Sequence, residues 1–258
     1  MKKVLRSFFL IINYKTIIVT TLSVISTYGC YHAGLTAKFP DMLVGVAIVF
    51  PVVFSIGSAY NRRETALQRF SDFKGHALAI YYAMRDWPVD KQHDLPQRVK
   101  VVVETMVILM RTMFTTKQAR AIAGNEKKIF QYFSQLSAMI IELRNYGVQS
   151  GEISRINQYL SKMIIAYDNL RIIYAYRTPV TLRAYSKVFI YIFPIIYGPY
   201  FASTFNDFSA DLEYVMPVLY SFILVSLDNI QDHLEHPFDE IGEDDIHIDE
   251  KELTMHME

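Results

Sequence analysis

The apolar residues of this chain are gathered into long segments that carry no charge. Residues 16–37, 42–60 and 188–206 contain no Lys, Arg, Asp or Glu. At about 1.5 Å of rise per residue, a helix of each segment reaches across the ~30 Å hydrocarbon layer of a bilayer. A fourth uncharged segment, 214–227, is shorter than usual for a spanning helix, so its ends must be hydrated or covered by neighbours. We therefore predict an all-α, polytopic membrane protein with transmembrane helices at about 14–37, 42–60, 188–206 and 212–228.

The distribution of basic residues predicts how these helices are oriented. Most of the 26 Lys and Arg residues lie in the connector 61–187, between the second and third segments. Between the first two segments there is only Lys38, and between the last two there is none. Because Lys and Arg are enriched on the cytoplasmic side of membrane proteins, we expect the connector, both termini and the acidic tail 229–258 in the cytoplasm. The expected location is a plasma membrane, the inner membrane in a bacterium.

The connector has the apolar periodicity of packed helices. From residue 153, apolar side chains recur every three or four positions, which predicts a helix with one face in a bundle: Ile153, Ile156, Leu160, Met163, Tyr167, Leu170 and Tyr174. Residues 98–114 are also apolar, but Lys100, Glu104 and Arg111 favour a buried bundle helix over a fifth span. Pro and Gly predict helix breaks at 87–88, 94–96, 123–125 and 147–151. We expect no strands, and one unit that comprises residues 1–258.

The sequence indicates neither an enzyme nor a nucleic-acid-binding protein. It has no Gly-rich phosphate loop, no Cys/His pairs at zinc-finger spacing and no Gly-x-Ser-x-Gly element. The basic residues are spread through helices and form no recognised nucleic-acid module. His233 and His236 would share one side of a helix among carboxylates, a spacing that allows a metal site. Against that site, Pro237 is expected to end the helix, and acidic tails are typically solvated surfaces. We therefore expect no catalytic residues and no nucleic-acid partner.

Three short motifs occur in order along the chain. Residues 69–74, Arg-Phe-Ser-Asp-Phe-Lys, follow the second segment, and residues 177–185, Arg-Thr-Pro-Val-Thr-Leu-Arg-Ala-Tyr, precede the third. After the fourth segment, His236-Pro237-Phe238 is followed by a cluster of carboxylates. With the four segments and the helical connector, these motifs make residues 15–250 resemble the bestrophin family of ion channels, in particular its bacterial members.

The resemblance implies both an assembly and a function. Bestrophins are pentamers in which the second span of each subunit lines a central pore that a cytoplasmic helical vestibule continues. Eukaryotic members conduct chloride and other small anions, whereas a bacterial member favours cations. For this chain the resemblance implies a homo-oligomer, a pentamer, whose partners are the lipid bilayer and permeant inorganic ions. Chloride is the expected ion.

The same resemblance points to pore residues in two registers. Alignment on Arg69 carries the three neck positions of the family onto Val53, Gly57 and Asn61, the register we prefer because more residues match. Alignment on the proline of eukaryotic members places the neck at Phe50, Phe54 and Ser58. By the same carry-over, Val180 is the cytoplasmic aperture residue.

The tail resembles the family's closing motif with departures. Pro237 and Phe238 are expected to anchor the tail, which by resemblance wraps a neighbouring subunit. The calcium site of eukaryotic members needs acidic residues directly after Pro-Phe-Gly. Here Asp239 replaces that glycine and residues 241–242 interrupt the acidic run before its last members, which are Glu243, Asp244 and Asp245. We therefore expect no cofactor, with calcium as the alternative.

The loops expected on the outer side are acidic. They hold Asp41, Asp207, Asp211 and Glu213, and fivefold repetition would place these carboxylates around the outer mouth as a rim that concentrates cations. A cation channel of the same architecture is therefore an alternative, as is a non-conducting membrane scaffold whose helical bundle docks partners.

Overall fold

The computed structural model describes residues 12–38, 41–176, 179–204, 212–240 and 245–257. These residues form helices and no strand, which confirms the predicted all-α class. The chain divides into two compact units. Unit 1 comprises residues 1–62 and 177–235, and unit 2 comprises residues 63–176 and 236–258.

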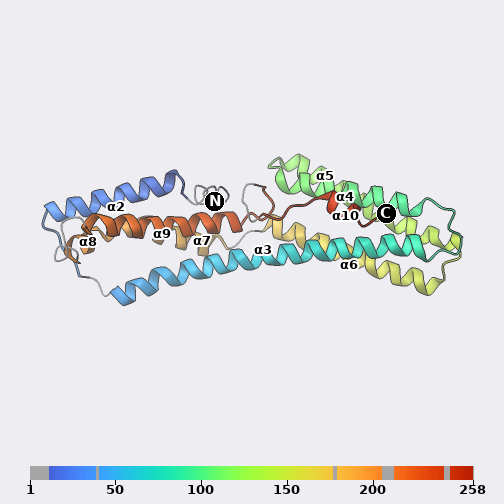
Figure 1. Ribbon diagram of the computed structural model, residues 1–258, viewed down its shortest axis with the longest axis horizontal. Helices are drawn as coiled ribbons and strands as arrows, with labels where there is room; N and C mark the ends of the chain where they lie inside the picture. The colour runs from blue at the N-terminus through green and yellow to red at the C-terminus, as the bar shows by residue number, and fades with distance from the viewer. Residues whose placement is uncertain (1–11, 39–40, 177–178, 205–211, 241–244, 258) are drawn as a thin grey trace. The chain divides into compact units, whose positions relative to one another are not determined.

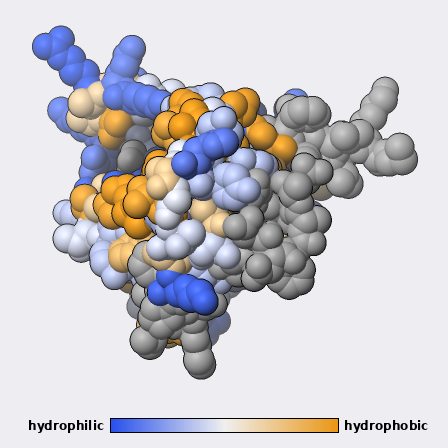
Figure 2. Space-filling model, turned by 90° about the vertical axis from the view of Figure 1, so that its left-hand side faces the viewer, coloured by the Kyte–Doolittle hydropathy of each residue, from blue (hydrophilic) through white to orange (hydrophobic). Residues whose placement is uncertain are grey.

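Unit 1 is built from α2 (Tyr14–His32), the first part of α3 (Asp41–Asp86), α7 (Val180–Ile196), α8 (Gly198–Thr204) and α9 (Leu212–Leu234). Figure 1 shows α2 alongside α7, α8 and α9. Their shared core contains Val19, Val52, Ile190, Leu224 and Val225. Apolar side chains also form part of the surface at the end of unit 1 that faces the viewer in Figure 2. Among the helices of the described residues, none is both long and apolar enough to cross a membrane.

The bend between α7 and α8 is supported by α2. Pro199 has no backbone N–H, so the carbonyl of Ile195 has no helical donor four residues later. The hydroxyl of Ser26 donates to that carbonyl at 2.7 Å. A Cβ on Gly198 would lie 2.4 Å from the same hydroxyl oxygen, so only glycine allows α2 to approach this closely.

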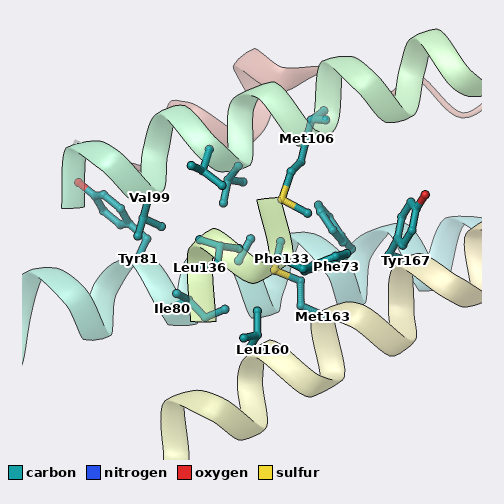
Figure 3. Packing of buried hydrophobic residues seen from close by; sticks show 14 of the residues in the cluster. Phe73, Ile80, Tyr81, Val99, Met106, Phe133, Leu136, Leu160, Met163 and Tyr167 are labelled. Carbon is teal, nitrogen blue, oxygen red and sulfur yellow. The ribbon is translucent and has the colours of Figure 1, made fainter. Parts of the chain in front are cut away.

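Unit 2 is a helical bundle made of the second part of α3, α4 (Leu95–Thr115), α5 (Ala119–Glu142), the 3-10 helix η1 (Leu143–Tyr146), α6 (Ser150–Ala175) and the short α10 (Glu250–Thr254). Figure 3 shows side chains from four of these helices meeting in one core, among them Phe73 of α3, Met106 of α4, Leu136 of α5 and Met163 of α6. The predicted seam is confirmed: Ile153, Ile156, Leu160, Met163, Tyr167 and Leu170 are buried, and Tyr174 packs against the same core.

Most of the expected helix breaks occur, but one prediction is wrong. Helix α3 ends at Asp86, immediately before residues 87–88, and Gly147 ends η1 in the left-handed conformation with φ of 80°. Residues 123–125, by contrast, lie within α5. A glycine inside a helix costs only about 1 kcal/mol relative to alanine, and the buried face of α5, which includes Phe133 and Leu136, outweighs that cost.

Candidate functional site

The first part of α3 has one buried side and one exposed side. Val52 and Ser55 are 1% exposed and Ala59 is fully buried, so this side packs against the other helices of unit 1. On the opposite side, Phe50 is 61% exposed and Phe54 is 56% exposed. The sequence from 42 to 60 places no charge on this helix. The exposed side of this first part of α3 is therefore an uncharged strip whose large side chains are apolar: Val46, Val49, Phe50, Val53 and Phe54.

Both predicted neck registers lie on this side of α3, where Gly57 and Ser58 are half-buried and Asn61 is exposed. Two adjoining hollows lie along this side of the helix. The first is lined by residues 46, 49, 50, 53 and 54, and the second by residues 53, 54, 57, 58 and 61. Together they include Val53, Gly57 and Asn61 of the preferred register and Phe50, Phe54 and Ser58 of the other. The two assignments are offset by three residues along the helix, which also turns one set by about 60° relative to the other, so both lie on the same side of the helix without coinciding. Either set would face one axis, and the neck itself stays a prediction.

The motif at residues 69–74 belongs to the core of unit 2. Phe73 is fully buried and Phe70 is 2% exposed. Around them, Arg69 pairs with Asp72 at 3.1 Å, and the Lys74 ammonium lies 2.8 Å from the Glu252 carboxylate of α10. The motif therefore packs the bundle and ties the C-terminal helix to α3. The link to residue 252 could not be read from the sequence, because the two residues are far apart along the chain.

A series of polar pairs joins α7 to α9. Arg183 pairs with Glu235 at 3.1 Å, Lys187 pairs with Asp232 at 3.1 Å, and the Tyr191 hydroxyl donates to Asp228. Successive members lie three or four residues apart, with Glu235 directly after the end of α9, so one side of α7 faces one side of α9 through these pairs. Sequence reasoning missed this series. Its only signal is the matching four-residue spacing of Arg183, Lys187 and Tyr191.

The start of α2 joins the same series. Asn13 caps α2 by accepting hydrogen bonds from the backbone N–H groups of Lys15 and Thr16, and its amide donates to Asn229 at 2.7 Å. The Lys15 ammonium lies 3.3 Å from Asp232. Burial acts to raise the pKa of Asp232, but the hydrogen bonds and charges of Lys187 and Lys15 outweigh burial and hold that pKa below its ordinary value.

The tail closes the core of unit 2. Phe238 is 4% exposed and stacks on Phe114 with ring centroids 4.8 Å apart. The backbone N–H of Ile246 donates to the carbonyl of Pro237 at 2.7 Å, and Arg111 pairs with Glu240 at 2.7 Å. These contacts lie within one chain, so the expected wrapping of a neighbouring subunit stays a proposal.

The comparisons with known proteins agree with this arrangement of helices. A single-substitution variant of a bacterial bestrophin homologue from Klebsiella pneumoniae matches with a TM-score of 0.80 and 14% identity, over 95% of this chain and 96% of that one. A second structure of the homologue, at 15% identity, matches with a TM-score of 0.75 over 95% of this chain and 97% of that one. Neither a protein-family model nor a curated protein sequence matches the chain.

The chain has the bestrophin fold. The sequence resemblance is therefore confirmed at the level of the fold, over nearly the whole length of both chains. A further variant of the Klebsiella homologue, with a TM-score of 0.76 and 14% identity, extends the match to 98% of this chain and 99% of that one.

Several predicted residues can be placed on the bestrophin fold only in part. Val180 is the first residue of α7 and is 67% exposed. Asp41 begins α3 and Glu213 is the second residue of α9, but the described part of the structure does not include their side chains. Asp207 and Asp211 lie outside the described residues, so the acidic rim stays a prediction.

The acidic residues considered for calcium are described at one position. Glu243 and Asp244 lie outside the described residues, and Asp245 is 7% exposed. Within the described parts of the chain, no three His, Cys, Asp or Glu side chains are grouped so that they could hold a metal ion.

Proposed function

We propose that the chain is the subunit of a bestrophin-type ion channel, a homo-pentamer that conducts chloride and other small anions passively through a central pore. The observation that carries the proposal is the exposed apolar strip of α3, on a helix whose other side is buried in unit 1. In a single subunit within the bilayer, Phe50 and Phe54 on this strip would contact lipid tails. Around a fivefold axis the strip forms an uncharged constriction in which an ion sheds part of its hydration shell.

The proposal places the helices of unit 1 in a bilayer, with the termini and unit 2 in the cytoplasm. Its support is the charge-free sequence together with the outer side of α2, where four large apolar side chains are each at least 44% exposed: Ile17, Ile18, Leu22 and Ile25. Exposed apolar side chains along a helix are stable against lipid tails. A matching structure described as that of a membrane protein, with a TM-score of 0.79 and 14% identity, is consistent with this placement.

The assembly is tested by native mass spectrometry of the purified protein in mild detergent. We expect a pentamer as the main species. A sample that is folded but only monomeric or dimeric would exclude a central pore and would favour the non-conducting scaffold.

Cation conduction is the second candidate, and the acidic rim favours it. Five copies of Asp41, Asp207, Asp211 and Glu213 would attract cations to the outer mouth. Their field extends only about 8 Å at physiological salt, so a rim changes how fast ions reach the pore more than which ion passes the neck. Replacing all four with Asn or Gln should raise the entry of chloride from the outer side at low salt and leave the sign of the reversal potential unchanged. A changed sign would assign selectivity to the rim.

A further inference from the structure

Asp228 and Gln231 are buried polar residues on α9 that each keep one oxygen without a hydrogen-bond donor. Both residues are 0% exposed. Oδ1 of Asp228 and Oε1 of Gln231 have no partner, whereas Oδ2 of Asp228 accepts from the Tyr191 hydroxyl. Residues three apart on a helix lie on the same side. Since buried acceptors are almost always paired, two unpaired oxygens on one side of the same helix call for a shared explanation.

The orientation of the Gln231 side chain is fixed by its other partner. Its Nε2 donates to Oε1 of Glu235 at 3.2 Å, and Oε2 of Glu235 accepts from Arg183 at 3.1 Å. Turning the amide over would set its oxygen against a carboxylate oxygen, with no hydrogen between them. Oε1 of Gln231 is therefore an acceptor that needs a donor from elsewhere.

The charged groups that face Asp228 do not supply that donor. They are Lys15 of α2, Lys187 of α7 and Asp232 of α9 itself, and both ammonium groups bind Asp232, at 3.3 and 3.1 Å. The side chains of these three residues are 29–33% exposed, so water screens their charges, whereas Asp228 has no contact with water. A fully buried carboxylate with one neutral donor and one unpaired oxygen is poorly stabilised as an anion.

We propose that Asp228 is a proton-binding site. The proton resides on Oδ1, and the resulting O–H donates to Oε1 of Gln231, so that one proton taken from solvent satisfies both unpaired oxygens. Tyr191 continues to donate to Oδ2. When the proton leaves, a buried negative charge remains beside Lys15 and Lys187 and draws their ammonium groups away from Asp232. Proton release therefore changes the pairing between α2, α7 and α9. The site does not depend on ion conduction.

Infrared spectroscopy of the purified full-length protein in lipid nanodiscs tests the site directly. We expect a carboxylic-acid C=O stretching band at neutral pH that shifts in heavy water and is absent from Asp228→Asn. Asp232→Asn is the matched control, because Asp232 lies one turn away and its two lysine partners keep it ionised, so this variant should retain the band. A wild-type spectrum at neutral pH without a band that depends on Asp228 would overturn the proposal.

A second variant keeps the test valid if Asp228→Asn folds poorly, and a stability measurement adds to it when that variant folds. Gln231→Leu removes the acceptor and should move the band to higher frequency, whereas an unmoved band would exclude the Asp228–Gln231 hydrogen bond. Thermal stability should fall as pH rises through proton release, because the native state then loses a proton that it binds more tightly than the unfolded state does. Asp228→Asn carries a permanent N–H donor and should lack this fall. A fall of equal size in both proteins would overturn the proposal.

Discussion

The ring of Phe238 stacks on the ring of Phe114, with centroids 4.8 Å apart and planes inclined by 25°. The two residues come from the tail and from α4, so the Pro-Phe element lies in the core of unit 2 of its own chain. Apolar residues that follow it, Ile246, Ile248, Leu253 and Met257, are buried in the same core. The tail therefore contributes to the stability of the bundle whether or not it also touches a neighbouring subunit.

Truncation of Phe238 tests this role. Removal of a buried phenylalanine side chain costs about 3–5 kcal/mol, so Phe238→Ala should lower the free energy of unfolding of unit 2 by about that amount and lower Tm. Met255→Ala is the control, since Met255 is 65% exposed in the same tail and should change stability by less than about 0.5 kcal/mol. Equal melting curves for Phe238→Ala and the wild type would show that the tail is a free appendage.

The Arg183–Glu235 pair should contribute strongly to the attachment of α7. The Glu235 side chain is 0% exposed and that of Arg183 is 22% exposed, so little water is available to replace the lost partner. Glu235→Ala should therefore destabilise unit 1 by about 3 kcal/mol, since it leaves a largely buried guanidinium unpaired. Glu152→Ala removes an exposed pair with Arg155 and should cost less than about 1 kcal/mol. Chemical unfolding compares the two variants, and similar costs would contradict the burial argument.

Substitution of Gly57 distinguishes the two neck registers. A Cβ at this position has open space within 4 Å, so Gly57→Leu should not disturb packing within the chain. In the preferred register the leucine side chain projects into the neck. Single-channel conductance should then fall several-fold, because the leucine narrows the pore at a position where glycine leaves it wide. Gly75→Leu, at another open glycine of α3 in unit 2, is the control for helix substitution. If Phe54→Ala raises conductance while Gly57→Leu has no effect, the register with Phe50, Phe54 and Ser58 is the correct one.

His76 should make unit 2 less stable at acidic pH. Burial and the nearby Lys162 ammonium lower the pKa of His76 below its ordinary value of 6.5, against the opposite effect of Asp72. The unfolded chain therefore binds a proton more readily, and stability is lost as pH falls through 6.5 toward the lower native pKa. In the wild type the ring centroids of His76 and Tyr159 lie 6.4 Å apart, and His76→Phe keeps an aromatic ring at this place. The variant should lose less stability between pH 8 and pH 5 than the wild type does. An undiminished loss in this variant would assign the pH dependence to other groups.

The sequence predicted the features that depend on local pattern. The spacing from Ile153 to Tyr174 identified the buried side of α6, because one helix face repeats every three or four residues. The wrong break at Gly124 shows the limit of this reasoning, since packing of α5 outweighs the glycine. The Tyr191–Asp228 and Lys74–Glu252 contacts could not be predicted, because they depend on how distant segments meet. The sequence also predicts both neck registers, whereas the fold shows which side of α3 is exposed.

Ion selectivity of the purified protein in a planar bilayer tests the central claim most directly. We expect single-channel currents whose reversal potential, under a potassium chloride gradient, lies near the equilibrium potential of chloride. A reversal potential near that of potassium would replace the anion channel with a cation channel of the same fold. Complete absence of current from a folded pentamer would contradict conduction through the strip on α3.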